Sequence, residues 1–323
     1  DDYQYENYFD NLKILPIYAL SKYSGSKAIR ILKTLIIPFR LKKLINKEKV
    51  IIKSNQMYGA WVPIIFKLIT RNPLLIRTGY DLLEFSIQEK KNLLKLFIYY
   101  LLTFFALNVS DIFVSTSKYD IKNLRNRFLF NRRKIFHIPN WVPILENDSQ
   151  VALNKKIIMV GRIEQQKRFD LALKLLSDTD FIVDIYGEGT LKNRFIQESK
   201  FTNNINFYEK VNNKNLLKKY KEYGFYLSLS DYEGNSKTIL EALASGCIVI
   251  ASNISNNLEI ITNGKNGFIF DRSNDNLIEL LNNIFSDHEI MKQISSEARL
   301  YIQKNNSIEV ITDKEFEILT KLI

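Results

Sequence analysis

From residue 155 onward, short apolar segments alternate regularly with segments of helical periodicity, and this alternation constrains the fold more than any other feature. The apolar segments have the length and composition of buried strands, and they lie at 156–161, 181–187, 205–209, 225–230, 247–252 and 267–270. The helical segments between them lie at 168–177, 190–200, 213–223, 237–245 and 274–285. Strands that alternate with helices of this length predict βαβ units, right-handed crossovers and a parallel sheet.

The first half of the chain repeats this pattern less regularly. Its strand candidates are 50–54, 74–78, 112–116 and 134–139, and its helix candidates are 58–70, 86–107 and 118–128. A polar linker that contains proline follows at 140–155. The expected fold class is therefore α/β, with two Rossmann-like domains whose parallel sheets face a central ligand cleft.

We expect the N-terminal domain at 1–145 and the C-terminal domain at 155–306. The last segment, 307–323, has apolar positions at helical spacing. It either crosses back onto the first domain or ends the chain as a plain helix. The sequence opens with DDYQYENYFD and no Met, which suggests that the natural start is missing.

The cysteine and histidine content argues against several kinds of site. The single cysteine, Cys247, cannot form an internal disulfide, and it lies in an apolar strand-like run that favours the core over a nucleophile. The two histidines, His137 and His288, are far apart and have no cysteine nearby. A zinc site and a Ser-His-Asp triad are therefore poorly supported, and we expect no metal.

The positive charge is concentrated in the first half. Residues 1–145 carry 24 Lys and Arg against 10 Asp and Glu, whereas residues 146–323 carry 22 against 25. Such a half suits anionic lipid headgroups, phosphorylated substrates or nucleic acid, and it equally suits a solvated lysine-rich surface. Nucleic acid is the least favoured partner, because no binding motif is recognisable. The longest uncharged run, 96–110, is shorter than the ~20 residues of a membrane-spanning helix.

Two predicted strands in the second half end in glycine next to charged residues. Gly161 ends one strand and is followed by Arg162 and Lys167, a set that can cancel the charge of a diphosphate. An exposed basic loop is the competing interpretation. Gly187 and Gly189 follow the next strand, but the dinucleotide fingerprint is incomplete because no third glycine follows, so this signal is weak.

The third strand end brings two carboxylates to a helix start. The segment SDYEGNSKTILEALASG places Glu233 in the turn and Glu241 on the following helix, with seven residues between them. Gly234, Asn235, Ser236 and Lys237 lie between the two glutamates, at the helix start. Backbone N–H groups at a helix start point toward anions. An ionised carboxylate accepts hydrogen bonds from hydroxyl pairs, so one glutamate on a sugar and one on a ribose describe a nucleotide-sugar site.

These residues resemble the family-4 retaining glycosyltransferases, which have the glycosyltransferase B fold. The resemblance covers about residues 155–285 and is carried by GRIEQQK, YGEG, SDYEGNSKTILEALASGCIVIAS and LEIITNGKNGFIF, in the order of the family. The first half resembles it only through SNQMYGAWVP, LLIRTGYD and IPNWVP.

The resemblance implies a role for each site residue. Arg162 and Lys167 would hold the diphosphate, and Glu233 would contact the donor hexose. Glu241 would hold the ribose, while the amides from Gly234 to Lys237 would bind sugar and phosphate. Gly187 and Gly189 would shape the nucleotide pocket. The family implies a UDP- or GDP-sugar donor, no cofactor and no metal, and retention by attack on the same face of the sugar.

Two departures from the family pattern concern the first domain. No glycine-rich turn is legible before residue 50, so the N-terminal βα unit is either missing or diverged. Gly79, Tyr80 and Asp81 stand where many members carry a histidine, which leaves Tyr80 or Arg77 as candidates for the acceptor side.

The favoured function is a hexosyltransferase of bacterial surface polysaccharide synthesis with a glycan or polyprenyl-diphosphate-linked glycan acceptor. The resemblance and the basic first half imply a cytoplasmic protein, peripheral on an anionic membrane, with 31–45 as one contact. That stretch could equally be an ordinary surface helix broken at Pro38. A nucleotide-sugar 2-epimerase and a non-catalytic nucleotide- or glycan-binding subunit remain the alternatives.

Overall fold

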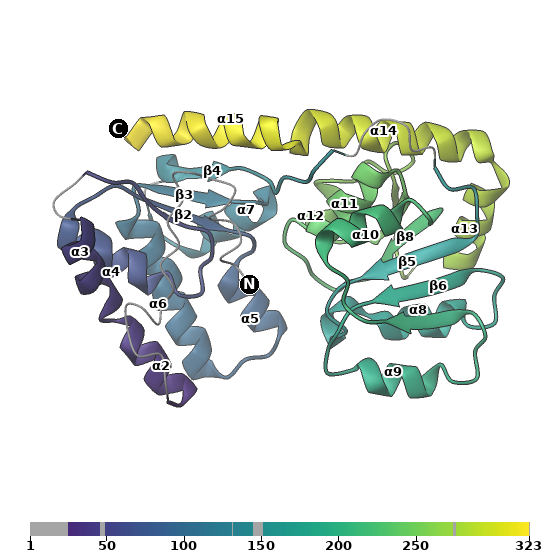
Figure 1. The fold of residues 1–323 in the computed structure, drawn as a ribbon, viewed down its shortest axis with the longest axis horizontal. Coiled ribbons are helices and arrows are strands. Elements are labelled where there is room, and N and C mark those ends of the chain that lie inside the picture. The colour runs from purple at the N-terminus through teal and green to yellow at the C-terminus, as the bar shows by residue number, and fades with distance from the viewer. Residues whose placement is uncertain (1–24, 46–48, 131, 145–150, 274–275, 323) are drawn as a thin grey trace.

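The computed structural model describes residues 25–45, 49–130, 132–144, 151–273 and 276–322. It consists of two α/β domains that lie side by side, with a long C-terminal helical segment running along both of them (Figure 1). Each domain contains one parallel sheet. The predicted fold class is confirmed. Residues 1–24 lie outside the described residues, so the prediction that an N-terminal βα unit is missing or diverged stays a prediction.

The first domain has a four-stranded parallel sheet in the order β1-β2-β3-β4. Its strands are β1 (Ile52–Ser54), β2 (Leu74–Thr78), β3 (Ile112–Ser115) and β4 (Ile135–His137). Its helices are α2 (Lys27–Thr34), α3 (Ile37–Ile45), α4 (Trp61–Thr70), α5 (Leu82–Gln88), α6 (Leu93–Val109) and α7 (Lys118–Arg127), with a 3-10 turn at Arg132–Lys134. All four strands fall within the segments that the sequence predicted.

The second domain has a six-stranded parallel sheet in the order β10-β9-β8-β5-β6-β7. Its strands are β5 (Lys156–Val160), β6 (Ile182–Tyr186), β7 (Ile205–Tyr208), β8 (Phe225–Ser228), β9 (Ile248–Ser252) and β10 (Phe268–Phe270). Its helices are α8 (Phe169–Leu176), α9 (Lys192–Glu198), α10 (Asn213–Tyr220), α11 (Lys237–Ser245), α12 (Ser255–Leu258), α13 (Leu277–Ser286) and α14 (His288–Asn306), with a 3-10 turn at Gln165–Lys167. All six predicted strands are present.

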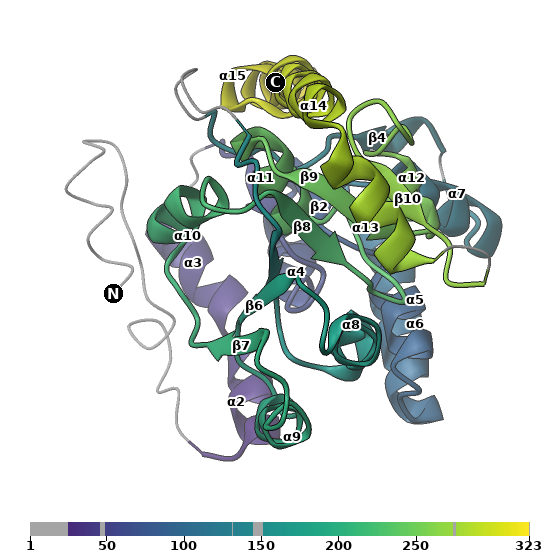
Figure 2. The ribbon, with the colours of Figure 1, turned by 90° about the vertical axis from the view of Figure 1, so that its right-hand side faces the viewer.

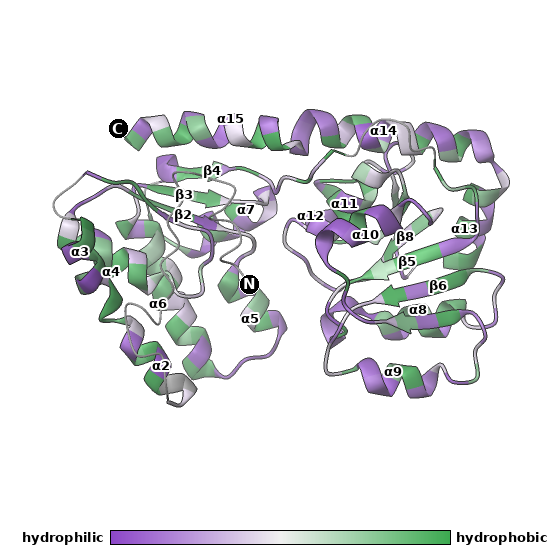
Figure 3. Cartoon of the chain, in the orientation of Figure 1, coloured by the Kyte–Doolittle hydropathy of each residue, from purple (hydrophilic) through white to green (hydrophobic). Residues whose placement is uncertain are grey.

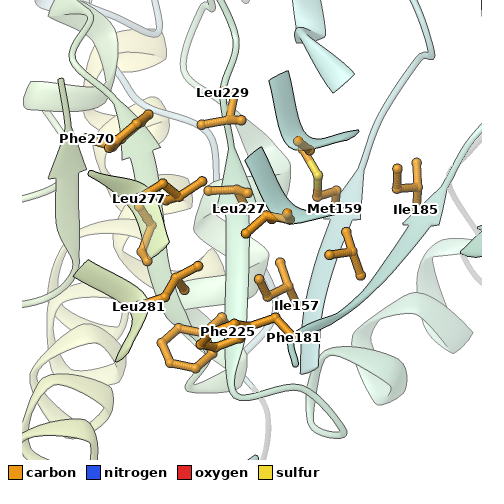
Figure 4. Close-up of a cluster of buried hydrophobic side chains, with 14 of the residues drawn as sticks. Ile157, Met159, Phe181, Ile185, Phe225, Leu227, Leu229, Phe270, Leu277 and Leu281 are labelled. Carbon is orange, nitrogen blue, oxygen red and sulfur yellow. The ribbon is translucent and has the colours of Figure 1, made fainter. Parts of the chain in front are cut away.

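The core of the second domain lies on both faces of its sheet, because side chains alternate along each strand. Ile157 and Met159 of β5 pack on one face with α8 and α13, and Ile158 packs on the other with α10 and α11. Figure 4 shows the first of these clusters, and Figure 2 shows helices on both sides of the sheet. Cys247 is 1 % exposed in the second cluster, so it is a core residue.

The C-terminal segment lies against the first domain. After α14, the helix α15 (Ile308–Leu319) and a 3-10 turn at Thr320–Leu322 follow above the first sheet (Figure 1). Ile311 and Ile318 of α15 pack with Leu75 of β2 and Val114 of β3 in one buried cluster. The end of the chain therefore ties the second domain to the first.

Two helix predictions in the first domain were wrong in detail. The single helix expected at 86–107 is two helices, because the carboxylate of Asp81 caps α5 and the side chain of Asn92 caps α6. Lys90 between them adopts a left-handed conformation with φ 53°. The stretch 31–45 breaks between α2 and α3, before Pro38, and Pro38 lies in the first turn of α3, where proline is tolerated.

Candidate functional site

A cavity of about 610 Å³ lies between the two domains. The first domain contributes the start of α5, the α5–α6 turn and α6, and the second domain contributes the ends of β5 and β8 and the start of α11. Carboxyl ends of parallel strands are where open α/β sheets bind ligands, so the position agrees with the fold. The volume is within the usual range of small-molecule sites, about 300–1,000 Å³.

Eight of the eleven site residues predicted from the sequence line this cavity. They are Gly161, Arg162, Lys167, Glu233, Gly234, Asn235, Ser236 and Lys237. The three others, Gly187, Gly189 and Glu241, are not among the lining residues. Tyr80 lines the cavity, whereas Arg77 donates a hydrogen bond of 2.9 Å to the carbonyl of Pro139, just before the linker.

Lys167 and Glu233 form an ion pair at the wall of the cavity. The Lys167 ammonium donates to Oε1 of Glu233, and the Ser230 hydroxyl donates to the same oxygen at 2.7 Å. Glu233 is 8 % exposed, so its charge needs these partners. The described hydrogen bonds of this carboxylate all reach Oε1, which leaves Oε2 available to a ligand hydroxyl.

The loop that carries these residues is fixed by backbone contacts from Gln166. Its side chain donates to the carbonyl of Tyr232 at 2.7 Å, and its own carbonyl accepts from the N–H of Asp231 at 2.9 Å. The loop after β5 is thereby held to the loop after β8. Gln166 lines the cavity and was not predicted as a site residue, although it lies inside the segment GRIEQQK.

Gly187 and Gly189 are required by close backbone packing. A Cβ atom at Gly187 would overlap the carbonyl of Gly161, and one at Gly189 would overlap the backbone of Ile163. These glycines therefore let the turn after β6 press against the loop that begins with Gly161 and Arg162. Their effect on the cavity is indirect, since they shape the loop that carries Arg162.

The start of α11 is bound to the linker between the domains. The N–H of Asn140 donates to Oδ1 of Asn235 at 2.8 Å, and its side-chain amide donates to the Asn235 carbonyl at 2.7 Å. The Asn140 carbonyl accepts from the amide of Asn306 at 2.8 Å. Asn235 is thus occupied by the linker through both its side chain and its carbonyl. These bonds use its Oδ1 and carbonyl oxygens, so its predicted role toward a ligand rests on its backbone N–H and side-chain NH2 donors.

Gly234 lies against the first domain. A Cβ atom here would overlap the carbonyl of Gly79 and would lie 3.1 Å from Cβ of Tyr80. Phe85 of α5 extends this contact, since its ring centroid is 4.5 Å from that of Tyr80 and 5.1 Å from that of Tyr232. The absence of a side chain at Gly234 therefore allows the two domains to meet beside the cavity.

Glu241 lies one turn into α11, is 2 % exposed and accepts a hydrogen bond of 2.7 Å from the side chain of Asn213 in α10. Burial raises the pKa of this carboxyl, while the hydrogen bond from Asn213 and the charge of Lys237 act in the opposite direction. Glu241 is therefore held in place by the protein itself, behind the N-terminal turn of α11 and outside the lining of the cavity.

A second set of contacts joins the domains at the start of α7. The Glu259 carboxylate accepts from the N–H groups of Lys118 at 2.8 Å and Tyr119 at 2.5 Å, and from the Ser117 hydroxyl at 3.1 Å. The amide of Asn256 donates to the same hydroxyl at 2.9 Å. A side chain of the second domain thus caps a helix of the first.

In the part of the chain that the structure describes, no group of three or more His, Cys, Asp and Glu side chains is placed to hold a metal ion. The cationic side chains that line the cavity are Arg162, Lys167, Lys237 and Lys91, and the N–H groups at the start of α11 add partial positive charge. Such a site can neutralise an anionic ligand and accept hydrogen bonds from hydroxyl groups.

Comparison with known proteins gives a consistent result. Residues 146–301 match the family model of glycosyl transferases group 1. The O-antigen biosynthesis glycosyltransferase WbnH of Escherichia coli is 24 % identical over 254 residues, which cover 78 % of this chain and 72 % of that protein.

A Campylobacter jejuni N-acetylgalactosaminyltransferase, named for a diphospho-undecaprenol-linked acceptor, is 25 % identical over 218 residues, or 63 % of this chain and 59 % of that protein. Among solved structures, Anabaena HepE in complex with UDP aligns with a TM-score of 0.74 at 16 % identity, covering 90 % of this chain and 84 % of HepE. At 16 % identity this structural match shows similarity of fold alone.

Proposed function

We propose that this glycosyltransferase, whose residues 146–301 match the family model of glycosyl transferases group 1, moves a hexose-type sugar from a UDP- or GDP-sugar, with retention, to a glycan or lipid-linked glycan acceptor. The observation that carries this proposal is the meeting of Arg162, Lys167, Glu233 and the start of α11 at one interdomain cavity. The cavity thus holds cations that can bind a diphosphate next to a carboxylate that can bind sugar hydroxyl groups.

The diphosphate of the donor lies against Arg162, Lys167 and the N–H groups at the start of α11. These groups neutralise the negative charge that grows on the leaving phosphate as the glycosidic bond breaks. Fixed cations supply this stabilisation without a metal ion, so the proposed reaction needs neither metal nor cofactor. Lys167 is already oriented by its ion pair with Glu233.

Glu233 binds the transferred sugar through Oε2. Its negative charge also stabilises the positive, oxocarbenium-like character of the sugar ring in the transition state. In the proposed reaction the acceptor hydroxyl attacks the face from which the diphosphate leaves, and the leaving phosphate takes the proton of that hydroxyl. Glu233 is therefore a binding and electrostatic residue in this proposal and forms no covalent bond to the sugar.

Glu241 holds the ribose hydroxyls of the donor. Its carboxylate is oriented by Asn213, and the ribose would extend the donor from the cavity toward α10. Gly187 and Gly189 shape this side of the site by letting the turn after β6 approach the loop of Arg162.

The first domain provides the acceptor side of the cavity. Tyr58, Tyr80 and Tyr99 line it there, and tyrosine rings with hydroxyl groups suit both the faces and the hydroxyls of sugars. The O-antigen name of WbnH and the diphospho-undecaprenol name of the Campylobacter relative support an acceptor in surface polysaccharide synthesis.

We further propose that the protein acts in the cytoplasm, on the inner face of an anionic membrane, through the start of α6. Leu93, Leu94 and Phe97 there are 83 %, 68 % and 59 % exposed, and Lys91 and Lys95 are their neighbours. Figure 3 shows the many apolar residues of α6 and the mixture of apolar and polar residues on α2 and α3. Exposed apolar side chains next to lysines suit the interface of an anionic bilayer.

No helix in the described residues is long and apolar enough to cross a membrane. The peripheral contact is tested by sedimentation with vesicles of phosphatidylglycerol and phosphatidylcholine. The variant Leu93→Ser/Phe97→Ser should lose most of its binding, whereas Phe201→Ser, which changes an 89 % exposed side chain of the second domain, should bind like the wild type. Equal binding of all three proteins would contradict this surface.

The reaction itself is tested by incubating the protein with UDP-, GDP- and ADP-hexoses and following the products by NMR. We expect release of the nucleoside diphosphate, either by transfer to an added glycan or by slow hydrolysis, and an α-sugar product from an α-linked donor. Inversion would contradict the retaining mechanism. An epimer at C2 would favour the epimerase, and a bound but unchanged donor would favour a non-catalytic binding subunit.

A further inference from the structure

A second concave surface lies on the first domain, between α7 and the edge strand β4. Its volume is about 440 Å³, and its lining includes Lys118, Lys122, Arg125 and Arg132, which define what we call the basic groove. Its lining also includes His137 of β4. All four cations are exposed, and the lining contains no carboxylate.

These cations are unpaired within the described chain. None of them lies within 4.0 Å of a described Asp or Glu carboxylate oxygen, whereas Arg127, further along the same helix, pairs with both Asp81 and Glu84. Among the described hydrogen bonds, the one that a side chain of these four residues donates links the Arg132 guanidinium to the Arg125 carbonyl at 3.4 Å. The four side chains therefore make no described ion pair, and the carboxylate of Glu259 reaches the backbone of this helix start rather than the Lys118 ammonium.

This arrangement costs stability rather than adding it. Lys118, Lys122 and Arg125 occupy one face of α7 at spacings of four and three residues, where like charges repel by a few tenths of a kcal/mol per pair. Lys118 is also the first residue of the helix, where the helix dipole disfavours a cation. A cationic row that opposes folding is explained by an anionic ligand that needs it.

The lining argues against a bilayer and against single-stranded nucleic acid. Its large apolar members, Ile121 and Ile135, are only 7 % and 6 % exposed, so they cannot insert into lipid. The lining contains no Phe, Tyr or Trp on which bases could stack. A concave row of cations about 10 Å long, from Lys118 to Arg125 on one helix, instead suits a flexible chain with repeated acidic groups.

The groove lies near the proposed active site. A smaller cavity of about 170 Å³ shares Lys118 and His137 with the groove, and it shares Asn235 with the interdomain cavity. A polymer whose end is in the interdomain cavity would thus have the basic groove nearby for its more distant residues.

We propose that the basic groove binds the acidic groups of an anionic glycan, the acceptor chain of the transfer reaction. The glycan is recognised by charge, through Lys118, Lys122, Arg125 and Arg132, at a place separate from the donor site. The inference rests on the proposed function, because it assigns an acidic character to the acceptor. The binding itself requires no turnover and can be measured alone.

The test measures binding of a fluorescent decameric oligogalacturonate by anisotropy at low and high salt, with a neutral dextran oligosaccharide of equal length as comparison. Lys122→Gln/Arg125→Gln should weaken binding at least tenfold and flatten its salt dependence, because two exposed charges are removed. The control Lys174→Gln/Lys200→Gln removes two exposed lysine charges from the second domain and should change binding less than twofold. The groove variant should unfold at the same temperature as the wild type or slightly higher.

The proposal is overturned if the wild type does not bind the oligogalacturonate, if it binds the neutral oligosaccharide equally, or if the groove variant binds like the control. Loss of binding to phosphatidylglycerol vesicles in the groove variant, with unchanged glycan binding, would assign the groove to lipid and overturn it too. Binding of a UDP-sugar by the groove variant, measured in parallel, should equal that of the wild type. Failure of donor binding in all proteins would refute the proposed function without affecting the groove.

Discussion

Replacing Glu259 by alanine should loosen the contact between the two domains at the start of α7. In the structure its carboxylate accepts hydrogen bonds from the N–H groups of Lys118 and Tyr119 and from the hydroxyl of Ser117. The Ser117 hydroxyl also accepts from the N–H of Asp120 at 3.2 Å, so the variant keeps part of its cap. The N–H groups of Lys118 and Tyr119 lose the carboxylate as acceptor and hydrogen-bond to water instead.

The expected cost is about 2 kcal/mol. Loss of a helix cap typically costs about 1 kcal/mol, and loss of a negative charge at a helix start adds roughly 0.3–1 kcal/mol. The hydrogen bonds to the Glu259 carboxylate are charge-assisted and so are stronger than neutral ones, which raises the expected cost toward about 2 kcal/mol. This corresponds to a factor of about 30 in the equilibrium for local opening.

Hydrogen exchange of the Lys118 and Tyr119 amides measures this opening directly and avoids assuming two-state unfolding of a two-domain protein. Exchange of both amides should accelerate roughly 30-fold in Glu259→Ala. Glu297→Ala is the control, because Glu297 lies on α14 and has no ion pair within the described residues. Unchanged exchange in Glu259→Ala would refute the contact between α7 and the second domain.

Three further changes have defined outcomes. Gly234→Ala should keep the domains apart, because its methyl group would overlap the Gly79 carbonyl; small-angle scattering should show a larger radius of gyration, and an unchanged radius would count against the contact. Asp120→Asn should make the free energy of unfolding less dependent on pH. Burial raises the pKa of Asp120 to about 7, so the folded state retains a proton that the unfolded chain loses near pH 4. Wild-type stability therefore falls as pH rises from about 4 toward 7. Thermal melts of both proteins from pH 5 to 8 check this, and parallel curves would contradict it. Lys167→Met leaves the buried Glu233 without its cation, so unfolding should become easier by about 3 kcal/mol and donor turnover should fall at least a hundredfold; a variant with native stability would show that the pair is not buried in solution.

The second domain could be predicted well from sequence because its strands are continuous apolar runs in a sheet covered on both faces. The bounds of α11 agree with the predicted 237–245, since Gly246 after its last residue adopts a left-handed φ of 84° that ends the helix. In the first domain, the apolar run through α6 concealed the break before it. The polar residues from Glu89 to Asn92 were the available signal.

The candidate site was predictable where its residues are neighbours in sequence and poorly predictable where they meet through folding. The turn that carries Glu233 and the loop of Arg162 were both identified from strand ends. The pairing of Asn140 in the linker with Asn235, and the capping of α7 by Glu259 of the other domain, join residues about 95 and 140 positions apart. No local pattern marks such a contact, because each partner alone is an ordinary polar residue on a loop.

The most direct test of the central claim is titration calorimetry of the protein with UDP- and GDP-hexoses, together with Arg162→Ala and Glu241→Ala. The account predicts that one nucleotide-sugar binds the wild type and that each substitution weakens binding at least tenfold, or about 1.4 kcal/mol. Binding that is unchanged in both variants, or absent from the folded wild-type protein, would contradict the assignment of the interdomain cavity as the donor site.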